Sequence, residues 1–193
     1  MGKIIVVAGV PGTGKTSVSR ELASLTGFQL IELGRYALER GLVTGFDDER
    51  GSYVIDEDAL SREVSMLAAS SEGYIIVSTH YPEILDPSVV EKVFVLRTHP
   101  LVLEKRLESR GWDRRKINEN VMAEILGVVS YNALTVFGEE KIYEIDTSNT
   151  TPGEVAGLIA NALSNKTVIP PGIRIDWLSV LSAEELSRFE SYE

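Results

Sequence analysis

Eight consecutive residues, 9–16 with the sequence GVPGTGKT, constrain this chain more than any other feature. They match the pattern G-x-x-x-x-G-K-[ST] without a mismatch and lie between an apolar run, residues 3–8, and a segment with a helical pattern. Gly9, Gly12 and Gly14 allow backbone conformations that bring N–H groups close to phosphate oxygens. The following helix N-terminus favours an anion. The motif therefore predicts a nucleoside triphosphate site.

Two side chains at the end of the motif carry the expected chemistry. Lys15 is expected to reach the outer phosphates, and Thr16 is expected to place its hydroxyl on Mg²⁺. Thr13, between Gly12 and Gly14, is also counted among the nucleotide-binding residues. The cofactor that these residues imply is Mg²⁺, with ATP as the co-substrate.

Composition limits the class of protein. With 193 residues, the chain suits one domain with a small appendage. It has no cysteine, which excludes disulfides, thiolate metal sites and cysteine nucleophiles. The two histidines, His80 and His99, are too few for a histidine-based zinc cluster. No run approaches the ~18 apolar residues of a membrane span, and no signal-peptide pattern is present, so we expect a cytoplasmic protein without a membrane partner.

Charge is unevenly distributed along the chain. The formal net charge of -10 argues against bulk nucleic-acid binding, because that binding depends largely on basic surface. Seven of the 19 basic residues nevertheless lie between Arg97 and Lys116. This cationic cluster suits a small, highly charged anion such as ATP, although a solvated helix face with i,i+4 pairs is the alternative for any one of its members.

The hydrophobic pattern predicts an α/β fold. Strands are expected at 3–8, 28–31, 74–77, 92–96 and 142–145, several of them as continuous Ile/Val runs typical of parallel strands buried on both faces. Helices are expected at 15–26, 33–41, 58–70, 100–110, 116–137 and 152–164. This alternation predicts a three-layer αβα sandwich around a five-stranded parallel sheet, with the ligand outside the carboxyl ends of the strands.

Three segments depart from the alternation. Residues 42–57 and 109–116 are polar and are expected to be mobile loops over the binding cleft. In the first of them Asp48 and Arg50 are candidate substrate-binding residues, with Arg50 holding a monophosphate or remaining a solvated loop charge. After about residue 165 the chain forms an extension, in which Trp177 is expected to anchor the segment and Ser182 to begin a short helix with a capping box. Ser148, after the last strand, is expected on the adenine side of the nucleotide.

A phosphate loop does not by itself distinguish a kinase from an ATPase or a GTPase. No N-K-x-D-type guanine-reading motif is present, and the chain is too short for a large ATPase module, so a small kinase fits best. The chain resembles the adenylate kinase 6 family of archaea and eukaryotic nuclei, in which nucleoside monophosphate kinase activity accompanies a role in small-ribosomal-subunit maturation. The resemblance covers residues 1–164 through GVPGTGKT, GFDDERGSYVIDEDAL, STHYPEIL, the segment from VFVLRTHP to VMAEI, and DTSNTTPGEV.

The resemblance implies a domain organisation and further site residues. Residues 1–164 resemble a nucleoside-monophosphate-kinase domain, with a monophosphate-binding segment at about 32–55 and a lid at about 109–119, and residues 165–193 form the extension. Ser17 matches an ATP-contacting position, as do Gly12, Gly14, Lys15 and Thr16. Arg110 would contact ATP and neutralise the moving phosphoryl group, with Arg106 facing the same way, and His80 would lie near the terminal phosphate. No general base is assigned, because phosphoryl transfer depends on positioning and electrostatic stabilisation.

One position departs from the family. The family usually has an aspartate that positions Mg²⁺ two residues before the histidine, where this chain has Ser78. Serine supplies no negative charge, so Mg²⁺ rests on Thr16 and the phosphates or on a carboxylate that the sequence does not identify.

Three functions therefore remain open from the sequence. The first is a broad-specificity nucleoside monophosphate kinase, mainly an adenylate kinase that converts ATP and AMP into two ADP. The second is an ATP-driven assembly factor that binds a basic ribosomal protein, with kinase or ATPase activity secondary. The third is a small-molecule kinase with a non-nucleotide acceptor.

Overall fold

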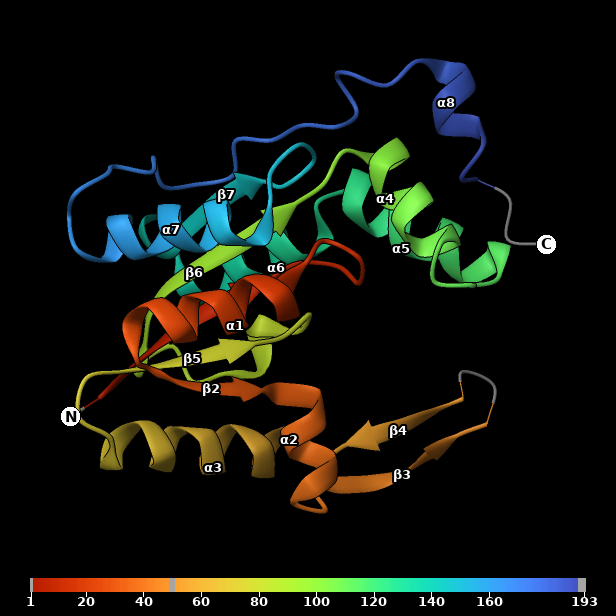
Figure 1. The fold of residues 1–193 in the computed structure, drawn as a ribbon. Coiled ribbons are helices and arrows are strands. Elements are labelled where there is room, and N and C mark those ends of the chain that lie inside the picture. The colour runs from red at the N-terminus through yellow and green to blue at the C-terminus, as the bar shows by residue number, and fades with distance from the viewer. Residues whose placement is uncertain (1, 49–50, 191–193) are drawn as a thin grey trace.

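A five-stranded parallel sheet forms the centre of the computed structural model, which describes residues 2–48 and 51–190 (Figure 1). The strand order is β2-β5-β1-β6-β7, and every neighbouring pair in this sheet is parallel. The strands are β1 (Lys3–Ala8), β2 (Gln29–Glu32), β5 (Tyr74–Ser78), β6 (Val90–Arg97) and β7 (Ile142–Asp146). The predicted five-stranded parallel sheet is thus confirmed.

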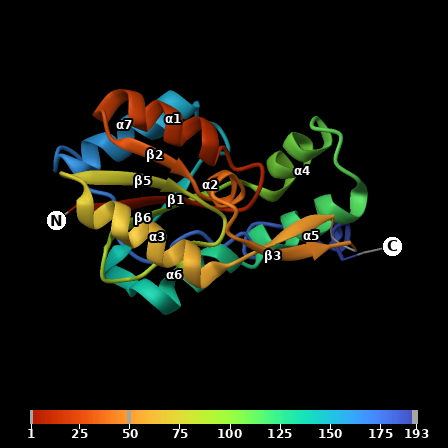
Figure 2. The same ribbon diagram turned by 90° about the horizontal axis from the view of Figure 1, so that it is seen from below.

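Helices cover both faces of the sheet, as the view from below shows (Figure 2). One face carries α1 (Lys15–Thr26) and α7 (Pro152–Leu163). The other carries α3 (Glu57–Ser70) and α6 (Val128–Phe137). The predicted three-layer αβα sandwich is therefore confirmed.

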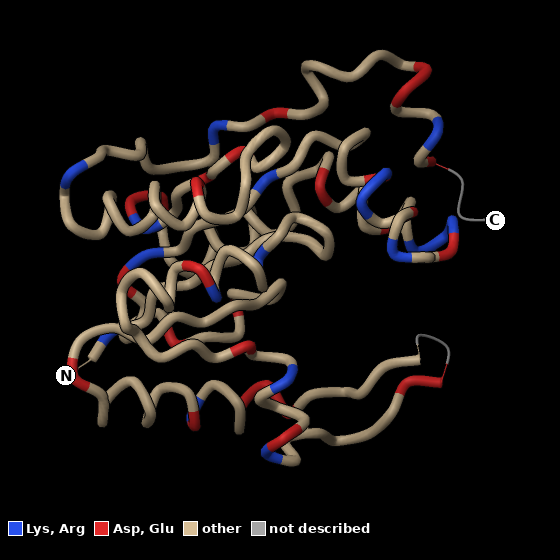
Figure 3. Tube along the Cα trace, viewed as in Figure 1, with Lys and Arg blue, Asp and Glu red and all other residues tan. Residues whose placement is uncertain are grey.

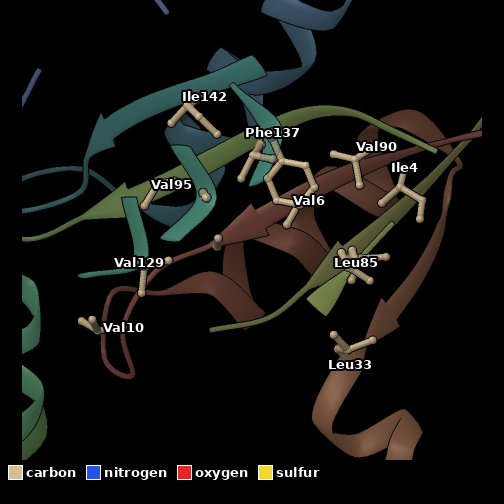
Figure 4. Close-up of a cluster of buried hydrophobic side chains, with 14 of the residues drawn as sticks. Ile4, Val6, Val10, Leu33, Leu85, Val90, Val95, Val129, Phe137 and Ile142 are labelled. Carbon is tan, nitrogen blue, oxygen red and sulfur yellow. The ribbon is translucent and has the colours of Figure 1, made fainter. Parts of the chain in front are cut away.

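Side chains of the central strands alternate between two hydrophobic clusters. In β1, Ile4 and Val6 join the cluster on the α3–α6 side, and Ile5 and Val7 join the cluster on the α1–α7 side. Figure 4 shows part of the first cluster, where Val6 lies near Phe137 of α6 and Ile4 lies near Val90 of β6. Because strands buried on both faces need apolar residues at every position, these segments appear in the sequence as continuous rather than alternating runs.

Two elements differ from the expected pattern. The predicted loop at 42–57 contains an antiparallel pair, β3 (Val43–Asp47) and β4 (Ser52–Ile55), whose Phe46 and Tyr53 rings lie 5.2 Å apart. These strands are largely exposed, so they lack the continuous apolar run that marks the central sheet. The predicted helix 116–137 is two helices, α5 (Arg114–Ile125) and α6, because Gly127 adopts a left-handed conformation with φ 64° between them.

The remaining elements are connections between the sheet elements or belong to the extension. They are α2 (Leu33–Glu39), α4 (Pro100–Glu108), α8 (Ala183–Ser187) and the short 3₁₀ turns η1 (Pro82–Ile84) and η2 (Glu139–Lys141). The β3–β4 hairpin and the α4–α5 pair both project beyond the carboxyl ends of the sheet strands (Figures 1 and 2). Among the described residues, no single helix is long and apolar enough to cross a membrane. By length and composition alone, one helix pair within this part of the chain, α5 and α6 with a bend of 49°, has the size and apolar character of a broken span.

The C-terminal segment packs along the domain. Trp177 is 7% exposed and donates a 2.8 Å hydrogen bond from Nε1 to Glu124 of α5, which confirms its anchoring role. Ser182 and Glu185 form the predicted capping box at the start of α8. Farther on, Arg188 contacts Glu104 of α4 at 2.9 Å, and the same carboxylate accepts a 2.6 Å hydrogen bond from Arg114 of α5. The extension therefore contacts both helices that flank residues 109–113.

Candidate active site

Glycines shape the loop between β1 and α1. Gly9, Gly12 and Gly14 have φ of 141°, 97° and 98°, a region that residues with a side chain rarely adopt. A Cβ on Gly12 would lie 2.6 Å from Leu103 Cδ1, and one on Gly9 would lie 2.6 Å from Leu96 O. The loop can therefore turn tightly and pack against α4 only with glycine at these positions.

Threonines attach the loop to the ends of β6 and β7. The hydroxyl of Thr147 lies 3.1 Å from Thr13 O and 2.8 Å from the hydroxyl of Thr98. Within the loop, Thr13 Oγ1 donates to Val10 O at 2.9 Å. Thr13, Thr98 and Thr147 are all buried, so these bonds are shielded from water and hold the loop rigidly at the edge of the sheet.

Two pockets lie on either side of this loop. The first, here called the loop pocket, has a volume of about 310 Å³. Its lining combines the loop and α1 with the ends of β2 and β5 and with the α4–α5 connection: Pro11, Gly12, Gly14, Lys15, Thr16, Ser17, Glu32, Leu33, Gly34, Arg35, Ser78, Thr79, His80 and Arg110.

The second pocket, here called the α7 pocket, has a volume of about 250 Å³. It is lined by Gly12, Thr13, Gly14, Val18, Arg106, Arg110, Thr147, Thr150, Pro152 and Val155. Gly12, Gly14 and Arg110 line both pockets. The two spaces therefore meet at the glycine-rich loop beneath Arg110.

Arg110 repels two other cations of this site, Lys15 and Arg106. Burial and the charge of Arg110 lower the pKa of Lys15 to about 8. Burial and the same Arg110 charge lower the pKa of Arg106. Figure 3 shows basic residues along α4, α5 and their connection, as the sequence cluster predicted. A bound polyanion would relieve this repulsion, so these residues are suited to contact an anion.

His80 is neutral in this environment. Its ring contacts that of Tyr81, with centroids 3.9 Å apart and planes tilted by 45°, and it lines the loop pocket. Desolvation of the imidazole and the charge of Lys15 lower the pKa of His80 to about 4. At neutral pH it can thus offer one N–H donor and one acceptor nitrogen rather than a positive charge.

Most of the predicted site residues line these two pockets. Those that do are Gly12, Thr13, Gly14, Lys15, Thr16, Ser17, His80, Arg106 and Arg110. Gly9 lies deeper and shapes the loop. Ser148 is adjacent to Thr147, but its hydroxyl contacts Asp146 and accepts a 2.7 Å hydrogen bond from the His99 backbone N–H. Its role on the adenine side stays a prediction.

The candidate acceptor residues are Asp48 and Arg50. Asp48 is exposed and follows β3, and Arg50 lies outside the described residues. Both remain predictions.

Two charged residues of the loop pocket lie in the segment predicted to bind the monophosphate, at about 32–55, but the sequence analysis did not name them as site residues. Glu32 ends β2, and Arg35 lies in the first turn of α2. Neither belongs to a motif, and the predicted strand ended one residue before Glu32. Their position at the carboxyl end of a strand that neighbours β5 was the available signal.

Oxygen donors suitable for Mg²⁺ surround the start of α1. The hydroxyls of Thr16, Ser17 and Ser78 and the carboxylate of Glu32 line one pocket, and oxygen ligands are those that Mg²⁺ prefers. Among the described residues, no group of three or more His, Cys, Asp or Glu side chains is arranged to hold a metal ion. The donor set fits a Mg²⁺ ion that keeps waters and phosphate oxygens as most of its ligands.

Comparison with known proteins places this chain in a family. The family model of the AAA domain matches residues 5–127. A protein named "Putative adenylate kinase" from Saccharolobus islandicus (strain L.S.2.15 / Lassen #1) is 37% identical over 175 residues, which cover 91% of this chain and 87% of the relative. Proteins of the same name from Sulfurisphaera tokodaii and Methanothermobacter thermautotrophicus are each 35% identical to this chain. The first match covers 95% of this chain and 90% of the relative, and the second covers 88% of this chain and 94% of the relative.

Solved structures share the fold at lower identity. A shikimate kinase from Acinetobacter baumannii in complex with shikimate superposes with a TM-score of 0.60 at 18% identity, covering 87% of this chain and 97% of that chain. A sugar kinase from Janibacter sp. superposes with a TM-score of 0.53 at 17% identity. The match covers 85% of this chain and 95% of the sugar kinase chain. These likenesses confirm the predicted P-loop kinase fold.

Proposed function

The chain belongs to the adenylate kinase family of these archaeal relatives, and from that premise we propose that it transfers the terminal phosphoryl group of ATP to AMP. The observation that carries the proposal is the junction of two pockets at Gly12, Gly14 and Arg110, with Lys15 in the lining of one of them. One pocket can hold the donor nucleotide and the other the acceptor, so the two phosphate chains meet beneath the same cations.

Charge and position explain the transfer. A phosphate oxygen of AMP forms a bond to the γ-phosphorus while the bond from that phosphorus to the β-phosphate bridging oxygen breaks, which leaves two ADP molecules. The Lys15 ammonium and the Arg110 guanidinium stabilise the negative charge that spreads over the transferred group. Thr16 would hold Mg²⁺, which would neutralise charge on the phosphate oxygens of ATP. An acceptor phosphate is already ionised at neutral pH, so no general base is needed.

Arg110 and Arg106 are expected to have different kinetic roles. Arg110 lines both pockets, whereas Arg106 lines the α7 pocket and donates to Thr147 O at 2.7 Å. Arg110→Ala should lower kcat by roughly tenfold to a hundredfold, because Arg106 replaces part of the lost charge. Arg106→Ala should mainly raise KM for ATP. Steady-state kinetics with exposed Arg115→Ala as the control would test this, and a larger kcat loss in Arg106→Ala would contradict it.

Nucleotide binding should weaken in alkaline solution. Only protonated Lys15 attracts the triphosphate, and its pKa in the free protein is about 8. Rising pH removes this proton before ATP binds, so the apparent Kd for ATP should rise about tenfold between pH 7 and pH 9. Calorimetry in buffers of different ionisation enthalpy should also detect proton uptake on binding. A Kd that stays constant to pH 9.5, or the same slope in Lys15→Ala, would contradict the assignment.

A bisubstrate analogue tests whether both pockets fill together. We expect a molecule that joins adenosine moieties through five phosphates to raise the unfolding temperature more than ATP and AMP supplied together at the same concentration. The shift should be lost in Lys15→Ala. A shift no larger than that from ATP would contradict simultaneous occupation and favour a non-nucleotide acceptor.

Broad acceptor specificity is the finer part of the proposal. The β3–β4 hairpin, which includes Asp48, is exposed and projects beyond the sheet. Such a segment can adapt to different bases. Among AMP, CMP, GMP and UMP as acceptors, we expect the values of kcat to differ less than the values of KM. Activity with AMP alone would restrict the proposal to adenylate kinase.

A second candidate function rests on the acidic charge of the chain. A net charge of -10 would attract a basic ribosomal protein of the small subunit. The corresponding proposal is an assembly factor whose ATP cycle controls this contact. Pull-down of purified small-subunit proteins at low and high salt tests it, with a complex that forms at low salt and depends on ATP as the supporting result. Binding to every basic protein alike would contradict it.

A further inference from the structure

We propose that Glu32 supplies the carboxylate for the Mg²⁺ ion of this site, a role that the serine at position 78 cannot fill. The inference rests on the proposed function, because it concerns the metal ion that accompanies ATP. Glu32 would act through metal-bound water, as outer ligands of Mg²⁺ commonly do.

Strand register places Glu32 beside Ser78. The strands β2 and β5 are parallel neighbours, and Glu32 pairs with Ser78 at the carboxyl end of both. In turn, Ser78 pairs with Val7 of β1, just before the glycine-rich loop. Glu32 and Ser78 therefore lie side by side on adjacent strands.

The alternation of side chains places both residues on the same face of the sheet. Leu30 of β2 and Ile76 of β5 pack in the cluster beneath α1, whereas Ile31 and Val77 pack on the opposite face. Glu32, two residues after Leu30, thus faces α1, and Ser78, two residues after Ile76, does the same. Thr16 is in the first turn of α1 on this side. All three line the loop pocket.

Charge in the loop pocket also favours this role. Its lining includes the cations Lys15, Arg35 and Arg110, and Glu32 is the single carboxylate among the lining residues. The Glu32 side chain is 25% exposed, so it can contact metal-bound water. Arg20 of α1 donates to it at 2.8 and 3.0 Å, and both bonds end on Oε1. Oε2 is the oxygen that we assign to the metal-bound water.

The Arg20–Glu32 pair supplies the alternative explanation, in which Glu32 only fastens β2 to α1. The two explanations differ in what removal of each partner does. If the pair is structural, Glu32→Gln and Arg20→Gln should change metal affinity to the same degree. If Glu32 holds the metal, Glu32→Gln should weaken metal binding, whereas Arg20→Gln should leave it unchanged or tighten it, because Oε1 is freed.

The experiment measures Mn²⁺ binding to the protein–ADP complex by electron paramagnetic resonance, which reports the free ion, with protein in excess over ADP. We expect the Kd for Mn²⁺ to rise about tenfold in Glu32→Gln. It should not rise in Arg20→Gln. In the double variant Glu32→Gln/Ser78→Asp, a carboxylate returns to the same face, and the Kd should fall back toward that of the unmodified chain.

Several results would overturn the assignment. An unchanged Kd in Glu32→Gln, or an equal rise in Glu32→Gln and Arg20→Gln, would leave only the structural role. A raised KM for AMP with an unchanged Mn²⁺ Kd would make Glu32 an acceptor contact. If Glu32→Gln does not fold, Glu32→Asn takes its place, because residue 32 is the N-cap of α2 and asparagine suits that position.

Failure of this inference can be separated from failure of the proposed function. ADP affinity is measured for every variant in the same series. An unmodified chain that binds ADP and forms ADP from AMP, with Mn²⁺ affinity independent of Glu32, contradicts the metal assignment alone. A chain that binds no adenine nucleotide contradicts the proposed function itself.

Discussion

Lys15→Ala is expected to lower kcat by about 10²–10³ while the protein stays folded, because it removes one preorganised cation from the transferred phosphoryl group. Lys15 lines the loop pocket next to the glycine-rich turn, and its Nζ donates to Val10 O at 3.0 Å. Its position is thus held by the same loop that binds the phosphates. Steady-state ADP formation at saturating ATP and AMP gives the loss directly.

The matched control for this prediction is Lys105→Ala. Lys105 is an exposed lysine of α4 outside the lining of either pocket. It should change kcat little, since surface charges away from the reacting groups contribute little to the transition state. If Lys15→Ala and Lys105→Ala lose activity to the same degree, Lys15 has no special role, and the site must lie elsewhere.

Glu144→Ala is expected to destabilise the protein by about 3–5 kcal/mol, because it leaves a buried arginine without one of its two carboxylates. The Arg97 and Glu144 side chains are 2% and 0% exposed, and they form a hydrogen-bonded ion pair. Glu144 also accepts from Ser130 Oγ at 2.5 Å and from the backbone N–H groups of Arg174 and Ile175 at 2.6 and 2.7 Å. One carboxylate thus joins β7, β6, α6 and the extension.

Urea unfolding measures this loss, and limited proteolysis reports the extension separately. The segment after residue 165 should become more sensitive to cleavage in Glu144→Ala than in the unmodified chain. Glu119→Ala is the control, because Glu119 forms an exposed i,i+4 pair with Arg115 and should change stability by no more than about 0.5 kcal/mol. A loss below about 1 kcal/mol in Glu144→Ala would show that solvent or other groups compensate Arg97.

The parts of the fold that could be predicted are those with strong local patterns. The central strands are buried on both faces, so β1, β5 and β6 appear as apolar runs in the sequence. The β3–β4 pair could not be predicted in this way, because its largely exposed side chains lack an apolar pattern. The break before α6 depends on the left-handed backbone of Gly127, which interrupts a helical pattern that otherwise continues.

In the candidate site, too, the residues that could be predicted are those that belong to a local sequence pattern. Residues within the phosphate-loop motif line the two pockets because the motif specifies both the residue types and their spacing. Glu32 joins them through the pairing of β2 with β5, a long-range contact that no sequence motif specifies. The buried Arg97–Glu124–Glu144 network likewise required the fold, since its members are separated by 20 residues or more along the chain.

The assay that tests the account most directly incubates the purified protein with Mg²⁺-ATP and AMP and follows ADP and free phosphate separately. The account predicts ADP formation that requires AMP, two ADP for each ATP consumed, and little free phosphate, because the acceptor rather than water takes the phosphoryl group. Phosphate release at a rate that neither AMP nor any other nucleoside monophosphate changes would contradict it.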